Sequence, residues 1–175
     1  MRNTLSHAFL LAASLFLAGC SDGTEALPVD KVDLASVLAS PLSDAAGQAE
    51  TRDSLKGKYV GFYFSASWCP PCRSFTPDLV AFRESHADEF EVLLVGADRS
   101  AAEQTRYMQE YDMPWPALPY GSKKAEELSE TFGIRGIPAL VVVSPDGTVL
   151  SANGRAEVQN LGARALKEWK KRQSP

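Results

Sequence analysis

The sequence predicts an α/β fold in which a central mixed β-sheet is flanked by helices on both faces. Three observations lead to this prediction. Apolar runs rich in β-branched and aromatic residues lie at 59–64, 90–97 and 139–143, each bounded by turn signals. Helical patterns separate these runs, and a Ser-Pro-Asp-Gly turn after the third returns the chain antiparallel. The order β-α-β-α-α-β-β-α is typical of a sheet covered on both sides.

The elements of the first half are expected as follows. Residues 32–38 favour a short helix, and the run at 59–64 is expected to be a buried central strand. A helix is expected from Cys72 to about His86. Pro77 lies inside it and should kink it, because proline lacks the N–H that the helix needs.

The second half of the chain continues the alternation of helices and strands. A helix is expected over Ala101–Glu110, whereas three prolines exclude a helix over 113–120. Another helix is expected over 123–132, and a short strand over 148–150 should follow the turn. Residues 158–171 predict one last helix, whose basic residues suit its negative C-terminal end.

The first 19 residues have the pattern of an export signal. One basic residue precedes an apolar run over 8–18 that is too short to cross a bilayer core of ~30 Å. A buried N-terminal helix is the alternative, but no amphipathic period supports it. We expect a signal peptide over 1–19, a polar tether over 20–30 and one folded domain over 31–175.

The four residues at 17–20, Leu-Ala-Gly-Cys, resemble the lipobox of bacterial lipoproteins. The resemblance implies that the Cys20 thiol is lipidated and that Cys20 becomes the new N-terminus. Several acyl chains are needed for stable anchoring, and such lipoproteins are multiply acylated. Ser21 in place of an aspartate implies sorting to the outer membrane. We therefore expect a protein anchored on the periplasmic side of a bacterial membrane.

Composition bounds the choice of partners. The formal net charge is −4 and no dense basic stripe is visible, which argues against a nucleic-acid partner. A hydrophobic content of 45% fits an ordinary globular domain, and we expect a monomer.

The stretch SASWCPPCR contains the two cysteines that the lipid does not use, Cys69 and Cys72. A structural zinc site needs four ligands, and the chain after residue 19 adds only His86, so no metal is expected. Covalent haem attachment needs histidine after the second cysteine, where Arg73 stands. A purely structural disulfide remains an alternative, although closing so short a loop contributes only about 2 kcal/mol.

A redox role for Cys69 and Cys72 accounts for more features of this stretch than a purely structural disulfide does. Cys69 is expected at a helix N-terminus, where unpaired N–H groups and the helix dipole stabilise a thiolate. Attack by Cys69 on a partner disulfide would give a mixed disulfide, which Cys72 would resolve. Pro70 and Pro71 stiffen the turn, and their missing N–H groups cost little in a first helical turn.

Three segments resemble the thioredoxin superfamily, within it the tryparedoxin and nucleoredoxin branch. They are FYFSASWCPPCRSFTP at 62–77, MPWPALPY at 113–120 and FGIRGIPAL at 132–140, and the resemblance spans about 55–150. It implies a thioredoxin-like fold. It also implies that Ile137-Pro138 is the cis-proline pair that faces the disulfide and aligns the substrate chain.

The resemblance also suggests the docking surface. We expect Trp68, Pro70 and Pro71, together with Ile137 and Pro138, to form the surface that contacts substrates. For Trp68, plain core packing is the alternative.

Two positions depart from the family pattern. Many thioredoxins bury an acid where this chain has Tyr63. A tyrosine of pKa about 10 is a poor base at neutral pH, so we expect Tyr63 to be a core residue. Tryparedoxins carry a tryptophan where Ala97 precedes Asp98. The resemblance therefore does not imply their glutathione-conjugate donor.

Together these features predict an exported, membrane-anchored thiol–disulfide oxidoreductase. It would exchange electrons with protein disulfide substrates through Cys69 and Cys72, without a metal or organic cofactor. We expect it to act as a reductant supplied by a membrane electron donor. The alternatives are a non-catalytic adaptor on the membrane and a thiol peroxidase-type antioxidant.

Overall fold

A computed structural model describes residues 29–49 and 52–173 of the chain. The expected signal peptide, the lipidation residue Cys20 and most of the expected tether lie outside this part. Among the described residues, none of the helices combines the length and the apolar character that crossing a bilayer requires.

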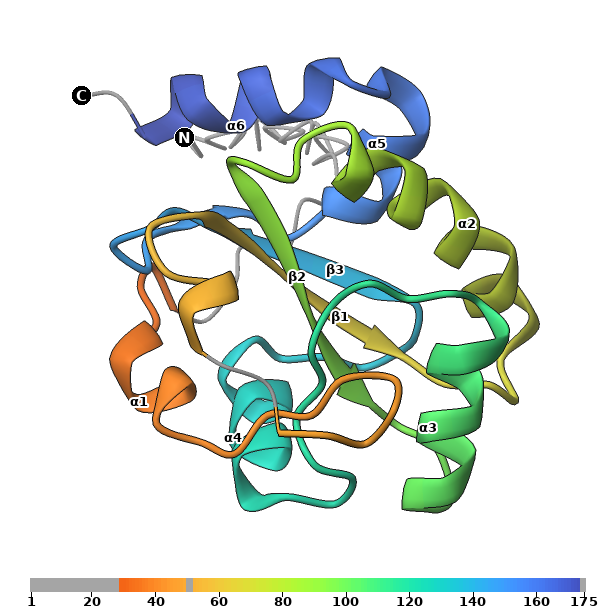
Figure 1. Cartoon of the computed structure of the whole chain (residues 1–175). Helices are drawn as coiled ribbons and strands as arrows, with labels where there is room; N and C mark the ends of the chain where they lie inside the picture. The colour runs from red at the N-terminus through yellow and green to blue at the C-terminus, as the bar shows by residue number, and fades with distance from the viewer. Residues whose placement is uncertain (1–28, 50–51, 174–175) are drawn as a thin grey trace, which may run out of the picture.

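Four strands form one mixed sheet, as the sequence predicted. They are β1 (Tyr59–Ser65), β2 (Phe90–Gly96), β3 (Ala139–Val143) and β4 (Val149–Ser151). The strand order is β2-β1-β3-β4 (Figure 1). Strands β1 and β2 are parallel, whereas β1–β3 and β3–β4 are antiparallel. The carboxyl ends of β1 and β2 therefore lie at the same edge of the sheet.

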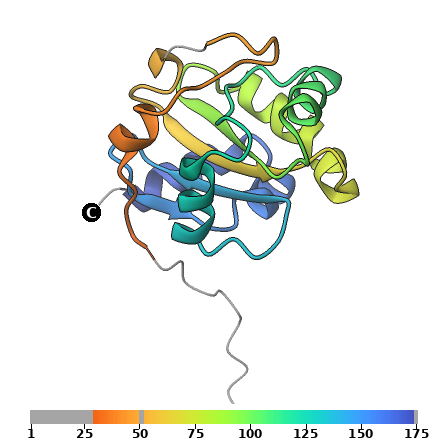
Figure 2. The same cartoon turned by 90° about the horizontal axis from the view of Figure 1, so that it is seen from below.

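Helices cover both faces of this sheet (Figures 1 and 2). One face carries α2 (Pro70–Glu84), α3 (Ala101–Glu110), α5 (Gly154–Leu161) and α6 (Arg164–Gln173). The opposite face carries α1 (Leu34–Leu38) and α4 (Lys123–Thr131). A short 3-10 helix, η1, spans Arg52–Ser54.

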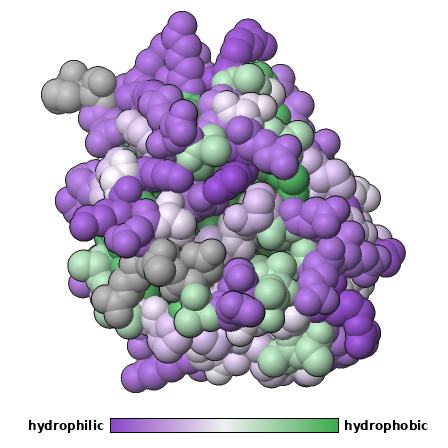
Figure 3. All heavy atoms as spheres, viewed as in Figure 1, coloured by the Kyte–Doolittle hydropathy of each residue, from purple (hydrophilic) through white to green (hydrophobic). Residues whose placement is uncertain are grey.

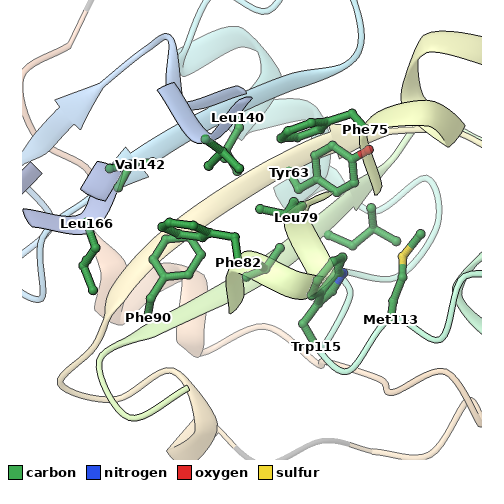
Figure 4. Close-up of a cluster of buried hydrophobic side chains, with 14 of the residues drawn as sticks. Tyr63, Phe75, Leu79, Phe82, Phe90, Met113, Trp115, Leu140, Val142 and Leu166 are labelled. Carbon is green, nitrogen blue, oxygen red and sulfur yellow. The ribbon is translucent and has the colours of Figure 1, made fainter. Parts of the chain in front are cut away.

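The alternation of side chains along β1 explains why both faces are covered. Val60, Phe62 and Phe64 are buried against α1 and α4. Tyr63 points to the other face, into a cluster with Phe75 and other apolar side chains (Figure 4). A strand that buries side chains on both faces has a nearly continuous apolar sequence, and this is the pattern from which β1 was predicted.

The structure corrects the expected helix boundaries. The last helix is not one but two, because Gly162 adopts a φ of +53° between α5 and α6 and interrupts the helical path. Helix α2 begins at Pro70 rather than Cys72, since proline is well suited to a first helical turn. Pro77 lies inside α2 as expected.

Both edges of the sheet are covered. The proline-rich segment at 113–120 runs beside β2, where the Leu94 N–H donates to the Pro116 carbonyl (2.9 Å). At the other edge, the Val149 N–H donates to the Asp30 carbonyl (2.8 Å). Covered edges protect a sheet from pairing with other chains. The face in Figure 3 is mostly hydrophilic, with apolar residues in small scattered groups.

Candidate active site at the Cys69–Cys72 disulfide

Cys69 and Cys72 form a disulfide between the end of β1 and the start of α2. Cys69 is the N-cap of α2, and its Sγ accepts the backbone N–H of Cys72 at 3.3 Å. Pro70 and Pro71 occupy the first two helical positions and are exposed. Cys69 therefore lies at a helix N-terminus, where backbone dipoles stabilise negative charge on its sulfur.

The two sulfurs differ in how far a partner can reach them. Cys69 is 4% exposed, whereas Cys72 is 0% exposed and lies on the inner side of the first helical turn. An attacking thiolate or a client disulfide can therefore approach only Cys69. This asymmetry suits Cys69 to the role of nucleophile and Cys72 to that of resolving residue.

The Ile137–Pro138 peptide bond is cis, as the family resemblance implied. It comes directly before β3, and the carbonyl oxygen of Ile137 lies 3.7 Å from Cys69 Sγ. A backbone acceptor thus borders the sulfur that faces the solvent. Both residues are partly exposed, so the surface of this loop is open beside the disulfide.

Trp68 is not a core residue. Its side chain is 47% exposed, and its Nε1–H donates to the Ala97 carbonyl at 2.9 Å. This hydrogen bond fastens the indole across the carboxyl ends of β1 and β2. The exposed ring therefore has a defined position beside Cys69, and core packing does not account for it.

Asp98 is a site residue that the sequence analysis did not assign. It is buried, and its Oδ1 accepts from the Ser67 N–H (2.8 Å) and the Ser67 hydroxyl (2.7 Å). These bonds hold the turn that leads from β1 to Cys69. A signal was available in the sequence, because Asp98 follows a strand parallel to β1 and so had to emerge beside this turn.

Four buried hydroxyls form a chain beneath the first turn of α2. The Tyr63 hydroxyl lies 2.9 Å from Thr76 Oγ1, which lies 2.7 Å from the Tyr107 hydroxyl. That hydroxyl lies 2.9 Å from Ser65 Oγ. Thr76 also donates to the Cys72 carbonyl at 2.9 Å. The chain thus ties α2, α3 and β1 together directly behind the disulfide.

Tyr63 is part of the core, as predicted. Burial raises the pKa of its phenol well above the usual value, and the neighbouring Tyr107 adds to the shift. Its hydroxyl therefore stays protonated at physiological pH and donates to the Cys72 carbonyl at 3.2 Å. It cannot serve as the base that an aspartate would provide. Figure 4 shows its ring against Phe75, with the two rings edge to face.

A groove of about 590 Å³ opens beside the disulfide. Neither cysteine lines it, but Trp68 and Ile137 do, and the Ile137 carbonyl lies 3.7 Å from Cys69 Sγ, which places the groove next to the disulfide. Within residues 29–49 and 52–173, no group of three or more His, Cys, Asp or Glu side chains is arranged to hold a metal ion.

Comparison with known proteins agrees with the fold, and the segment that matches contains both cysteines. A family model described as thioredoxin-like matches residues 57–149. Nucleoredoxin from Mus musculus is 45% identical over 128 residues, which cover 71% of this chain and 29% of that protein. Tryparedoxin from Trypanosoma brucei brucei is 44% identical over 109 residues, which cover 60% of this chain and 74% of that protein.

A solved structure shows the same architecture. The tryparedoxin structure from Trypanosoma brucei superposes with a TM-score of 0.66 at 38% identity, covering 75% of this chain and 92% of that one. The chain spans less than a third of the nucleoredoxins that it matches, but most of the tryparedoxins. The chain therefore belongs to the thioredoxin-like family, in the branch that contains tryparedoxins and nucleoredoxins, and carries the cysteine pair of a thiol–disulfide oxidoreductase.

Proposed function

We propose that this protein is an exported, membrane-anchored oxidoreductase that reduces disulfides in other proteins. The observation that carries the redox part of the proposal is the asymmetry of the cysteine pair. Cys69 is the sulfur that a partner can reach, and it caps α2, whereas Cys72 is wholly buried behind it. This arrangement suits a nucleophile and its resolving partner, because only the nucleophile has to be reached by the client.

The reaction starts from the dithiol form. The Cys69 thiolate attacks one sulfur of a client disulfide, forms a bond to it and releases the other client sulfur as a thiolate, which takes up a proton. The Cys72 thiol then loses its proton and attacks Cys69. This step closes the Cys69–Cys72 disulfide and releases the second client sulfur as a thiolate, which takes up a proton in place of the one that Cys72 lost. Two electrons pass from the protein to the client.

The local backbone favours the thiolate of Cys69. The Cys72 N–H points at its sulfur, and the N-terminal end of α2 places partial positive charge nearby. Both effects favour the thiolate form of Cys69 once the disulfide is reduced. A larger share of the protein is then reactive at neutral pH.

The client is proposed to bind across Trp68 and the Ile137–Pro138 loop. The exposed indole offers a rigid apolar surface, and the Ile137 carbonyl offers an acceptor for a client backbone N–H. Pro70 and Pro71 are exposed on the same turn and complete the surface. A short backbone pairing of this kind would align a client sulfur with Cys69.

The cellular setting is proposed from the sequence pattern at the N-terminus. Lipidated Cys20 would anchor the protein on the periplasmic side of a membrane, with Ser21 directing it to the outer membrane. A membrane electron donor would keep the dithiol reduced. Cys20→Ala should abolish incorporation of labelled palmitate and release the protein from the membrane fraction.

Reduction of insulin disulfides by dithiothreitol tests the activity. The wild-type protein should accelerate insulin precipitation, and Cys69→Ser should reduce the rate to that of dithiothreitol alone. A reduction potential near −270 mV would support a reductant, whereas one near −120 mV would support an oxidant. If Cys69→Ser leaves cellular function unchanged, the protein is an adaptor and the proposal fails.

A further inference from the structure

The groove beside the disulfide has apolar walls next to the reactive sulfur. Its lining includes the side chains of Trp68, Ile134 and Ile137. Ile137 lines the groove and its carbonyl lies 3.7 Å from Cys69 Sγ, so the groove lies next to the sulfur that a client must reach. The residues that line the groove are therefore placed to contact a client segment next to its reactive cysteine.

All charged side chains that line the groove, among the described residues, are acidic. They are Asp98, Glu126 and Glu130. Glu126 and Glu130 are four residues apart on α4, which places them on one face of the helix, one turn from each other. Both are exposed, and neither has an ion-pair partner among residues 29–49 and 52–173. Glu127, by contrast, lies outside the groove and pairs with Lys124 at 2.7 Å.

Asp98 gives a second, independent indication of a cationic ligand. The residue is only 6% exposed, and its Oδ1 is occupied by Ser67. Its Oδ2 is buried and accepts no hydrogen bond within the described part of the chain. A buried carboxylate oxygen without a donor is costly, so a donor from a bound client would satisfy an acceptor that the fold leaves open.

We propose that this groove selects client segments with lysine or arginine beside the reactive cysteine. The inference rests on the proposed function, because the occupant is a client polypeptide. A basic side chain would lie between the carboxylates of Glu126 and Glu130 or reach Asp98, while the neighbouring apolar residues contact Trp68. A client with acidic residues at the same positions is repelled.

Exposed ion pairs each change binding by a modest factor, about two- to fivefold. Several pairs along one groove should give a preference of about tenfold. Because the Debye length is only ~3 Å at 1 M salt, the preference between exposed charges should shrink as salt is added.

The test uses three disulfide peptides that differ only at the two residues flanking one cysteine, which are lysine, glutamine or glutamate. The measured quantity is the second-order rate constant of a single turnover with the purified, reduced full chain. The lysine peptide should react about tenfold faster than the glutamate peptide at low salt, and less than about threefold faster in 1 M sodium chloride. A ratio below about twofold at low salt overturns the inference.

Two double variants test whether the charge preference arises in the groove. Glu126→Gln with Glu130→Gln should lower the lysine-to-glutamate ratio to about threefold or less. Glu84→Gln with Glu110→Gln changes the net charge equally on exposed positions outside the groove, and should keep the wild-type ratio. If the first pair keeps the full ratio, or the second pair lowers it as much, the groove does not select for charge.

The glutamine peptide separates the two proposals. If the wild-type protein does not reduce it, the proposed reductase function fails. If the protein reduces all three peptides at equal rates, the function stands and only the charge selection is wrong.

Discussion

The backbone N–H of Cys72 donates to Cys69 Sγ at 3.3 Å. The residue that later displaces the client from Cys69 therefore also stabilises the Cys69 sulfur through its own main chain. This contribution does not depend on the Cys72 side chain, so the two roles of Cys72 can be separated by mutation.

Cys72→Ala should keep Cys69 reactive, because the variant retains the N–H and the helix N-terminus. Without a resolving thiol, the variant should lose turnover and accumulate a mixed disulfide with its client. Non-reducing electrophoresis followed by mass spectrometry detects the adduct. Cys69→Ala is the control and should trap nothing, since Cys72 is buried. Adducts on Cys72 in that control would contradict the assigned roles.

Tyr63→Phe should destabilise the protein without changing its chemistry. The variant loses the hydrogen bonds to Thr76 and the Cys72 carbonyl, which should lower the free energy of unfolding by about 1 kcal/mol. Because the raised pKa keeps the phenol protonated, the pH profile of insulin reduction should not move. Urea unfolding and the pH profile together check this. Loss of a titrating step from the profile would show that Tyr63 transfers a proton.

Glu91 is a buried carboxylate on β2 that depends on Arg83 of α2. Arg83 Nε donates to Glu91 Oε1 at 2.8 Å, and the pair raises the pKa of Arg83, first through this hydrogen bonding. Arg83→Met leaves the buried charge with Lys58 at 3.7 Å and the Val92 N–H at 3.1 Å, and should lower the free energy of unfolding by about 3 kcal/mol. Adding Glu91→Leu should recover most of that loss in urea unfolding. A double variant as unstable as the single one would contradict this explanation.

Asp146 in the β3–β4 turn should make the free energy of unfolding depend on pH in the acid range. Hydrogen bonds from Lys31 first, then Ser144 and Thr148, lower the pKa of its carboxyl below the value of about 3.9 expected in the unfolded chain. The stabilisation is complete above that value and is lost as pH falls through the folded-state pKa. Asp146→Asn should therefore unfold more easily in urea at pH 7, with the difference from wild type vanishing at low pH. If Asp146→Asn remains less stable than wild type at low pH, the loss comes from altered packing in the turn and not from the charge of Asp146.

The elements around the cysteine pair could be predicted because local signals agree there. The apolar run of β1, the prolines at the start of α2 and the short spacing of the cysteines all act within one segment. The interruption at Gly162 was visible in principle, since glycine readily adopts positive φ. The helical pattern on both sides of it favoured one continuous helix instead.

The buried hydroxyl network behind the cysteine pair could not be predicted from local sequence signals. Thr76, Tyr107 and Ser65 come from three elements, and their hydroxyls meet only after α2 and α3 pack on the sheet. No periodicity or spacing connects them. In the sequence alone, Glu126 and Glu130 have the spacing of an ordinary solvent-exposed helix face. Only the fold shows that this face of α4 lines the groove next to the disulfide.

The pH dependence of Cys69 alkylation tests the central claim most directly. The purified protein is reduced, treated with iodoacetamide at a series of pH values, and the modification of Cys69 is followed by mass spectrometry. A half-maximal rate well below pH 8.5, with Cys72 unmodified, is the predicted result. Equal modification of both cysteines, or a midpoint at or above that value, would contradict the assignment of Cys69 as the activated nucleophile.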